Sequence, residues 1–298
     1  PLTDAAILPA GERVAMTTDG FVVNPLFFPG GDIGRLAVCG TVNDLAVSGA
    51  VPRYLSCAMI LEAGLPLETL RRVVASMAET AREAGVLIVT GDTKVVEGGA
   101  CAGIYITTAG VGVFPAGRAV PSQQPQAGDV ILCTSPVASH GMAVMAARHN
   151  LSFDPAIASD VRPLNHAIRA VLDAGVGVRA MRDPTRGGVA GTLNEWAGSA
   201  LDITLVEEAL PVRADARAAC EILGIDPVYV ANEGVALFSL PAGEAQIALS
   251  ALRTTPGCEE AAIIGGVSFG TGRVFAKTQI GTFRRILPPS GELLPRIC

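Results

Sequence analysis

Short apolar segments of strand type alternate with longer segments of helical spacing along almost the whole chain, and this alternation limits the folds it can adopt. Before residue 115 the expected order is strand, helix, strand, helix, strand, strand. Residues 115–128 are poor in bulky apolar side chains and rich in Pro, Gln and Gly, which is typical of a domain boundary. Strands and helices alternate again beyond it. We therefore expect a two-domain α+β protein.

Local signals place most of the expected elements. Pro66 and Gly85 are typical of the first turn and the C-cap of one helix. Residues 86–90 (VLIVT) predict a short buried strand. Helices are expected at 34–49, 66–85, 141–149, 163–174, 188–198, 214–223 and 242–253. Strands are expected at 12–23, 54–61, 86–90, 102–114, 129–134, 203–206, 235–240 and 261–267.

The composition excludes several classes of protein. Half of the chain is apolar, so it can bury a sizeable core, and a net charge of -6 without a basic run argues against nucleic-acid binding. No apolar run reaches the ~18 residues of a membrane span, and no signal sequence opens the chain. The first residue is Pro1, so we expect the natural N-terminus to lie upstream.

Seven cysteines are spread along the chain without a C-x-x-C pair, and the chain has only three histidines. A zinc or iron–sulfur site is therefore not expected. Most of these cysteines lie among Ala, Val and Leu and are interpreted as small buried apolar residues. The pattern favours a reducing, cytoplasmic compartment.

The chain ends in a proline-rich run, residues 286–298, whose last residue is Cys298. Pro288, Pro289 and Pro295 disfavour helix, so an extended, mobile tail is expected. Thirteen residues at ~3.3 Å each reach roughly 40 Å. Two interpretations remain open from position alone: a thiol on a swinging arm, or a frayed terminus that happens to end in cysteine.

Acidic residues follow apolar segments at Asp19, Asp44 and Asp92, and Asp183 lies beside the Gly187–Gly188 pair. Carboxylates at strand ends can converge on one face of a sheet, hold Mg²⁺ and, through it, phosphate. Backbone N–H groups of a Gly-Gly pair can approach phosphate at a helix N-terminus. Each aspartate taken alone is more often a cap or turn residue. Neither a Walker loop nor a Rossmann fingerprint is present.

Lys94 is one of only two lysines in a chain that otherwise uses arginine. A compact ammonium group suits acid–base or phosphate chemistry, although a solvated surface lysine is the plainer interpretation. Glu233, between Asn232 and Gly234, is a second candidate base, and from the residues alone a turn is favoured there.

Six motifs give the sequence a resemblance to the family of hydrogenase maturation proteins HypE. That family belongs to the wider PurM-like superfamily of aminoimidazole ribonucleotide synthetase, selenophosphate synthetase and thiamine-phosphate kinase. The terminal PRIC is the most specific motif, whereas NDL and D-x-T-R-G-G occur across the superfamily. The motifs are FFPGGDIG (27–34), TVNDLAVSGA (41–50), GDTK (91–94), DPTRGGV (183–189), NEG (232–234) and PRIC (295–298).

The resemblance implies a fold and its division. An N-terminal ATP-binding and dimerisation domain (1–116) with a mixed sheet is expected, followed by a C-terminal α/β sandwich domain (117–282) and a mobile tail (283–298). It also implies a homodimer in which the N-terminal strands of two subunits pair into a barrel.

The resemblance further implies a carbamoyl dehydratase. Such an enzyme receives a carbamoyl group on its C-terminal cysteine from the carbamoyltransferase HypF. It dehydrates this group to a thiocyanate with ATP and passes cyanide to iron held by HypC and HypD, for the active site of a [NiFe]-hydrogenase. The alternatives are a small-molecule kinase or synthetase of the same superfamily and a non-catalytic thiol carrier.

The residues carried over from the family have three roles. The implied catalytic residues are Cys298, Lys94 and Glu233, and the implied Mg²⁺ ligands are Asp19, Asp44, Asp92 and Asp183. The implied ATP-binding residues are Asp19, Asn43, Asp44, Asp92, Thr93, Asp183, Thr185, Arg186, Gly187 and Gly188.

Overall fold

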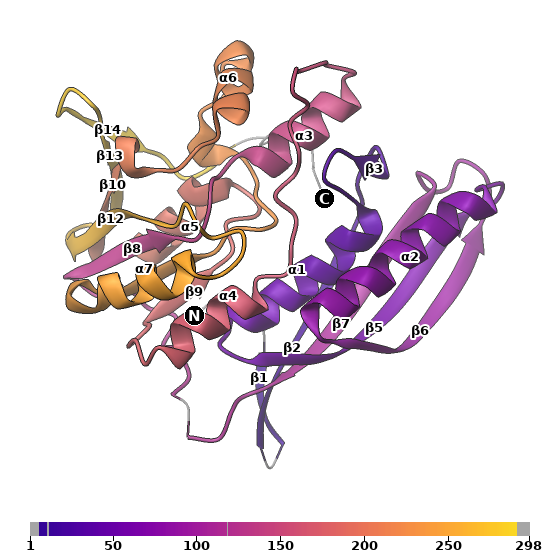
Figure 1. Ribbon diagram of the computed structural model, residues 1–298, viewed down its shortest axis with the longest axis horizontal. Coiled ribbons are helices and arrows are strands. Elements are labelled where there is room, and N and C mark those ends of the chain that lie inside the picture. The colour runs from indigo at the N-terminus through magenta and orange to yellow at the C-terminus, as the bar shows by residue number, and fades with distance from the viewer. Residues whose placement is uncertain (1–5, 11, 118, 291–298) are drawn as a thin grey trace.

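The computed structural model describes residues 6–10, 12–117 and 119–290, and these form two packed α/β units (Figure 1). The expected α+β class is confirmed by the two mixed sheets and the helices that cover them. Within this part of the chain, no helix is long and apolar enough to cross a membrane.

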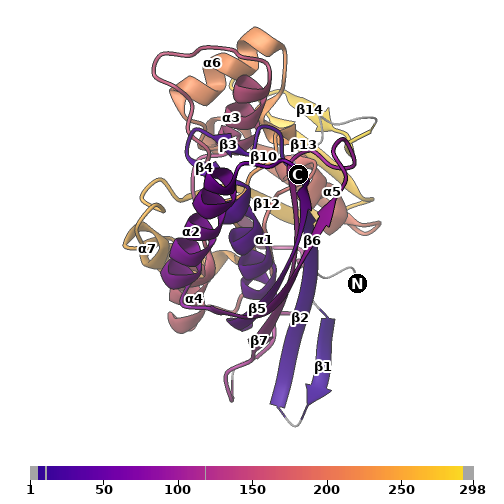
Figure 2. The same cartoon turned by 90° about the vertical axis from the view of Figure 1, so that its right-hand side faces the viewer.

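The first unit is a five-stranded sheet covered by helices α1 (Ile33–Val47) and α2 (Leu67–Ala84) on one face. The strand order is β1-β2-β7-β5-β6, antiparallel except for the β5–β6 pair. None of the helices in the described part of the chain covers the opposite face (Figure 2). The strands are β1 (Ala6–Ala10), β2 (Glu12–Phe21), β5 (Val51–Glu62), β6 (Leu87–Val96) and β7 (Ile104–Val113). A short hairpin, β3 (Phe27–Phe28) and β4 (Gly31–Asp32), precedes α1.

The second unit is a seven-stranded sheet between two layers of helices. The strand order is β14-β13-β10-β12-β8-β11-β9. Helices α3 (Ser139–Arg148), α5 (Gly188–Ala197) and α6 (Ala214–Leu223) contribute to the core on one face, and α4 (Asn165–Asp173) and α7 (Ala245–Arg253) to the core on the other. The strands are β8 (Asp129–Cys133), β9 (Ala180–Arg182), β10 (Leu201–Val206), β11 (Leu237–Pro241), β12 (Ala262–Phe269), β13 (Arg273–Lys277) and β14 (Phe283–Ile286). Three 3₁₀ turns are η1 (Glu207–Ala209), η2 (Pro227–Tyr229) and η3 (Ala242–Glu244).

Helix α1 lies between the two units, and thirteen of its fifteen residues are buried. Its sequence is accordingly apolar almost all round, as expected of a helix with neighbours on every side. Asp32 caps its N-terminus by accepting hydrogen bonds from the backbone N–H groups of Gly34 and Arg35. At Gly40 a Cβ would come within 2.8 Å of the Phe21 ring, so glycine lets the helix approach the sheet. Helix α1 therefore couples the two units.

Strand β6 differs from the expectation of a short buried strand. It runs for ten residues along the edge of its sheet, and Leu87, Val89 and Val95 are each more than half exposed. Apolar runs predict strands but not whether a strand lies at the centre or the edge of its sheet. Strands β1, β9, β13 and β14 were not predicted, and β14 lies within the stretch expected to form the tail.

Asp129 fixes the interdomain linker to the second sheet. Its buried carboxylate pairs with Arg179 (Nε–Oδ1 2.9 Å) and accepts hydrogen bonds from the Ser239 hydroxyl and the Gln126 backbone N–H, both at 2.9 Å. Replacing a buried, fully bonded carboxylate leaves its partners without an acceptor.

We expect Asp129→Ala to lower the free energy of unfolding by about 3 kcal/mol, measured by urea denaturation. Asp173→Ala is the matched control, because Asp173 forms an exposed i,i+4 pair with Arg169 and should cost less than about 0.5 kcal/mol. Equal losses in the two variants would contradict the role given to Asp129.

Candidate active site

An acidic cavity of about 340 Å³ lies where the two units meet. Asp19 comes from β2 and Asp44 from α1, whereas Asp183, Thr185 and Arg186 come from the loop between β9 and α5. Glu233 comes from the loop before β11. The structure thus brings six of the predicted site residues to one cavity. Its remaining lining residues are Gly20, Phe21, Gly40, Arg182, Thr192 and Glu195.

Asp19 and Asp44 form a carboxyl pair in this cavity. Burial raises the pKa of Asp19 above its usual value, and hydrogen bonds with Asp44 and Thr41 partly oppose this shift. The Thr17 hydroxyl donates to Asp44 Oδ2 at 2.9 Å. Two carboxyl groups in hydrogen-bond contact need a proton or a cation between them. Among the described residues, however, no three His, Cys, Asp or Glu side chains are grouped to hold a metal ion.

The loop that carries Glu233 is fixed through its backbone. Glu233 N donates to Asp160 Oδ1 at 2.7 Å, and its carbonyl accepts from Asn43 Nδ2 at 3.3 Å. The neighbouring Asn232 accepts from Ala138 N and donates to Pro184 O. Glu233 itself is 3% exposed. A carboxylate on so constrained a backbone is positioned for a defined contact.

Asp160 was not predicted as a site residue. Its second oxygen accepts from the backbone N–H of His140 at 3.1 Å, so one buried carboxylate joins the start of α3 to the Glu233 loop. Burial raises the pKa of Asp160 to about 6, against the lowering effect of backbone hydrogen bonds and the Arg162 charge. A single aspartate in a stretch without periodicity gives no sequence signal of partners on two other elements.

Asn43, expected to bind the nucleotide, is buried and does not line the cavity. Its Oδ1 accepts from Leu164 N at 2.8 Å, and its Nδ2 donates to the carbonyls of Arg162 and Glu233 at 3.2 and 3.3 Å. The side-chain amide therefore has backbone partners on both ends, and it holds α1 against the Glu233 loop. Its role as a nucleotide ligand stays a prediction.

Lys94, Asp92 and Thr93 are not among the residues that line the acidic cavity. Lys94 Nζ lies 2.9 Å from Asp92 Oδ2 on edge strand β6, with both side chains well exposed. The hydrogen bond from Lys94 lowers the pKa of Asp92. Lys94 pairs in register with Ile60, which is 40% exposed, so the lysine projects from the face that α1 and α2 leave free.

Asp19 projects from the opposite face of that sheet. It hydrogen-bonds with Thr41 and Asp44 of α1, and its strand is separated from β6 by β7 and β5. Three strand steps correspond to about 14 Å. Within one subunit, the sheet itself separates Lys94 from the carboxylates.

Gly187 and Gly188 also lie outside the lining of the acidic cavity. The N–H of Gly188 donates to Thr185 O at 3.1 Å, and a Cβ at this position would meet the carbonyls of Val228 and Val230. A Cβ at Gly187 would approach the Pro289 ring to 2.8 Å. Both glycines therefore permit close packing. Phosphate binding by their N–H groups stays a prediction.

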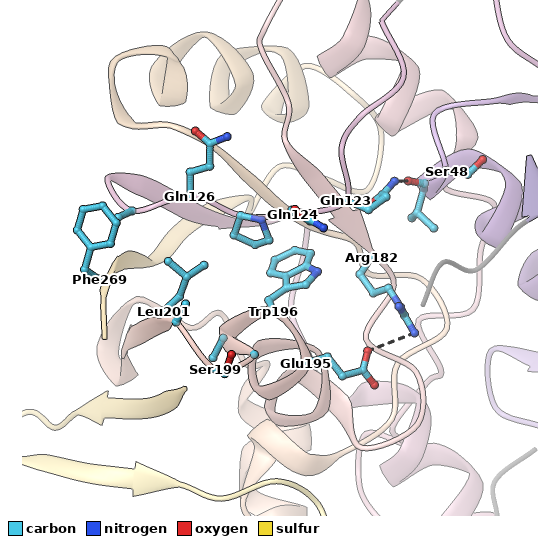
Figure 3. Close-up of a pocket in the computed structure, with 16 residues that line it drawn as sticks. Ser48, Gln123, Gln124, Gln126, Arg182, Glu195, Trp196, Ser199, Leu201 and Phe269 are labelled. Atoms are coloured by element: carbon cyan, nitrogen blue, oxygen red, sulfur yellow. Dashed lines mark hydrogen bonds and ion pairs between the residues drawn. The ribbon is translucent and has the colours of Figure 1, made fainter. Parts of the chain in front are cut away.

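A larger cavity of about 820 Å³ adjoins the acidic one and shares Arg182 and Glu195 with it (Figure 3). The ion pair between them (3.4 Å) lies at the boundary. Trp196, Leu201 and Phe269 make the remaining wall largely apolar. The larger cavity lacks the cluster of carboxylates that distinguishes its neighbour.

Cys298 lies outside the described residues. The other six cysteines are unpaired and buried, and burial raises the pKa of several of their thiols, including that of Cys133 to about 12. None of these six is therefore suited to act as a nucleophile.

The fold agrees with comparisons against known proteins. Residues 2–114 match the N-terminal domain of AIR synthase related proteins, and residues 126–276 match their C-terminal domain. The chain therefore belongs to the AIR synthase related proteins.

Within that class, the chain belongs to the carbamoyl dehydratase HypE family. It is 48% identical to carbamoyl dehydratase HypE of Rhodobacter capsulatus, over 100% of this chain and 88% of the relative. It is 51% identical to carbamoyl dehydratase HypE of Azotobacter vinelandii, over 98% and 86%.

Two solved structures are similarly close. HypE in complex with ATP aligns with a TM-score of 0.91 at 46% identity, covering 100% of this chain and 90% of that one. HypE in a HypE–HypF complex aligns with a TM-score of 0.91 at 45% identity, covering 96% and 93%. The resemblance noted from the sequence motifs is confirmed.

The raised pKa of Asp160 predicts a pH dependence. Its folded-state value of about 6 exceeds the ordinary 3.8, so its stabilising contribution is full below pH 4 and is lost as pH rises through 6. Between pH 4 and pH 7 the free energy of unfolding should therefore fall by on the order of 2 kcal/mol more in the parent than in Asp160→Asn. Urea denaturation of both proteins across this pH range measures the difference. An equal change in the free energy of unfolding with pH in parent and variant would contradict the raised pKa of Asp160.

Proposed function

We propose that this protein uses ATP to dehydrate an S-carbamoyl group on its own Cys298 to a thiocyanate. The observation that carries the proposal is the convergence of Asp19, Asp44, Asp183 and Glu233 in one cavity, in a chain of the carbamoyl dehydratase HypE family. The product serves as the source of the cyanide ligand for the iron of a [NiFe]-hydrogenase.

The chemistry needs a group on the carbamoyl oxygen that can leave. ATP transfers its γ-phosphoryl group to that oxygen, and the carbon–oxygen bond then breaks to release phosphate. Both N–H protons are lost, so that R–S–C(=O)–NH₂ and ATP give R–S–C≡N, ADP and phosphate. ATP binding is supported by the similar HypE structure that contains ATP.

Glu233 is the base we assign to the cavity. Its backbone is held by Asp160 and Asn43, which fixes the origin of its side chain with respect to a carbamoyl group entering the cavity. A positioned general base contributes on the order of 10²–10⁴ in rate. Lys94 is the second group that we assign to proton transfer or to phosphate binding.

The carboxylates of the cavity are of the donor type that Mg²⁺ prefers, but no three of the described ones are grouped to hold the ion by themselves, so the phosphates of ATP would have to supply further ligands. Asp19, Asp44 and Asp183 offer the hard oxygen ligands that this ion prefers, and a cation would replace the proton that the Asp19–Asp44 pair otherwise needs. Bound there, Mg²⁺ would neutralise phosphate charge during phosphoryl transfer. Asp92 and Thr93 lie elsewhere in the subunit and join this site only from a second copy.

We infer that a second copy pairs with the free face of the first sheet. Met16, Tyr54 and Ile60 are each at least 40% exposed there, on the same face as Lys94. Exposed large apolar side chains on one sheet face are typical of interaction surfaces. In such a homodimer, Lys94 of one subunit would complete the cavity of its partner, which the sheet prevents within one subunit.

Partner proteins follow from the same proposal. A HypF-type carbamoyltransferase would load Cys298, and the similar HypE–HypF structure supports such a contact. A HypC–HypD iron scaffold would receive the cyanide. The six unpaired cysteines agree with a reducing, cytoplasmic compartment.

The direct test is the intact mass of the carbamoylated protein after addition of Mg-ATP. We expect loss of the mass of one water molecule, located at Cys298 by peptide mapping, and no loss without ATP. No loss of water with ATP present would overturn the dehydratase assignment. A small-molecule kinase or synthetase would instead retain ATP turnover in Cys298→Ala, and a non-catalytic carrier would show no ATP hydrolysis at all.

The arrangement of the homodimer predicts complementation. Lys94→Ala and Glu233→Gln should each lower the dehydration rate at least ~10²-fold. After the two variants are mixed and exchange subunits, half of the dimers contain one subunit of each variant. In such a dimer one of the two cavities has both an intact Glu233 and an intact Lys94. About a quarter of the parental activity should therefore return.

Lys277→Ala, which alters the only other lysine, is the matched control and should retain full activity. If Lys94 acts within its own subunit, mixed dimers will remain inactive.

A further inference from the structure

Residues 286–289 do not leave the second sheet freely but lie along helix α5. Asn194 Nδ2 donates to Ile286 O at 3.4 Å, and the Tyr229 hydroxyl donates to Leu287 O at 3.1 Å. The Pro289 ring lies over Gly187 and Gly191, where an added Cβ would come within 2.8 and 3.6 Å of its Cγ. The backbone thus runs from the last turns of α5 towards its first turn.

Neighbouring residues hold the groups that make these contacts close to one another. Gly188 brings η2 against the start of α5, which places Tyr229 beside Leu287. Arg284 of β14 pairs with Glu207 and, at 2.8 Å, with Asp226, which caps η2. The strand before the arm and the turn that holds the arm are therefore joined to each other.

The first turn of α5 borders the acidic cavity, because Arg186 and Thr192 line it on either side of Gly187 and Gly191. Pro289 does not itself line the cavity, but it packs on glycines that are next in sequence to two of the lining residues. The larger cavity is lined by Trp196 and Ala197, at the opposite end of α5. The path of residues 286–289 leads towards the acidic cavity and away from the larger one.

We propose that Gly187, Gly191 and Tyr229 form a guide that aims the C-terminal arm into the acidic cavity, with Tyr229 as a positioning residue. This proposal rests on the proposed function of Cys298. From Pro289, the nine residues 290–298 reach at most ~30 Å when fully extended.

Release of the guide would move the tether's origin back to Ile286, the last residue of β14, by about 10 Å. The free tether would lengthen from nine to twelve residues. Lengthening alone lowers the effective concentration of Cys298 by only about 1.5-fold, because it falls as the −3/2 power of length. The displaced origin adds to this, so we expect a total loss of roughly three- to fivefold.

The test compares two adjacent prolines. Pro289→Ala removes the ring that contacts Gly187, whereas Pro288→Ala makes the same chemical change at an exposed position. Tyr229→Phe removes only the hydroxyl that holds Leu287. We expect Pro289→Ala and Tyr229→Phe to slow single-turnover loss of water at Cys298 roughly three- to fivefold, and Pro288→Ala to leave the rate unchanged.

A second measurement distinguishes an effect on the guide from an effect on the cavity. A carbamoylated peptide of residues 291–298, added to Cys298→Ala protein, bypasses the guide, and its dehydration rate should be the same with and without Pro289→Ala or Tyr229→Phe. Equal slowing of the peptide and the tethered arm would place the effect in the cavity and overturn the proposal. So would an unchanged rate for the tethered arm.

A third measurement does not need dehydration at all. In a Ser290→Cys/Cys298→Ser background, a nitroxide spin label can be attached selectively at residue 290, because the other six cysteines are buried. Pro289→Ala and Tyr229→Phe should increase its motion, and Pro288→Ala should not. If the parent never dehydrates a carbamoyl group, the proposed function fails, and this measurement alone decides whether the guide exists. Identical spectra in all variants would overturn it.

Discussion

The buried carboxylate of Asp160 is the interaction on which the acidic cavity depends. It accepts backbone hydrogen bonds from Glu233 and from His140, so it ties the Glu233 loop to the start of α3. Asn43 completes the junction from α1, with its amide bonded to the backbone of Arg162, Leu164 and Glu233. Burial of an ionisable group is unfavourable, and here the backbone N–H bonds offset only part of that cost, because the pKa of Asp160 stays raised at about 6. The two units are thus held together by the contacts that fix Glu233.

Much of the fold could be predicted because its signals are local. Helix α2 begins after Pro66 and ends at Gly85, which adopts the left-handed conformation expected of a C-cap. Strands β13 and β14 were not predicted because each is only four or five residues long, and because β13 joins the sheet through β10, which is distant in sequence. The exposure of β6 follows from its place at the edge of a sheet, which no local pattern specifies.

In the candidate site, too, some residues could be predicted from the sequence and others could not. Asp19, Asp44, Asp183 and Glu233 were recognised from their motifs, and the structure brings them to one cavity. Asp160 and Arg162 were missed because they contact the loop of Glu233 and Gly234, more than seventy residues away in sequence, mainly through its backbone groups. Gly187 and Gly188 were interpreted as phosphate ligands, which stays a prediction, and the structure shows in addition that they lie against the Pro289 ring and the backbone of η2. A glycine pair indicates close approach but not what approaches.

The strength of attachment decreases along the arm, which suits a tethered substrate that must also leave. Ile286 is buried in the sheet, and Arg284 holds the same strand through two ion pairs. Beyond it, a single hydroxyl bond of Tyr229 and the contact of Pro289 with glycine remain, and the bond contributes about 1 kcal/mol. Such contacts bias the arm towards the cavity without retaining it. For a reacting group on a tether, as proposed for Cys298, the effective concentration is already roughly millimolar, so tighter binding would add little to the rate and would hinder transfer to a partner.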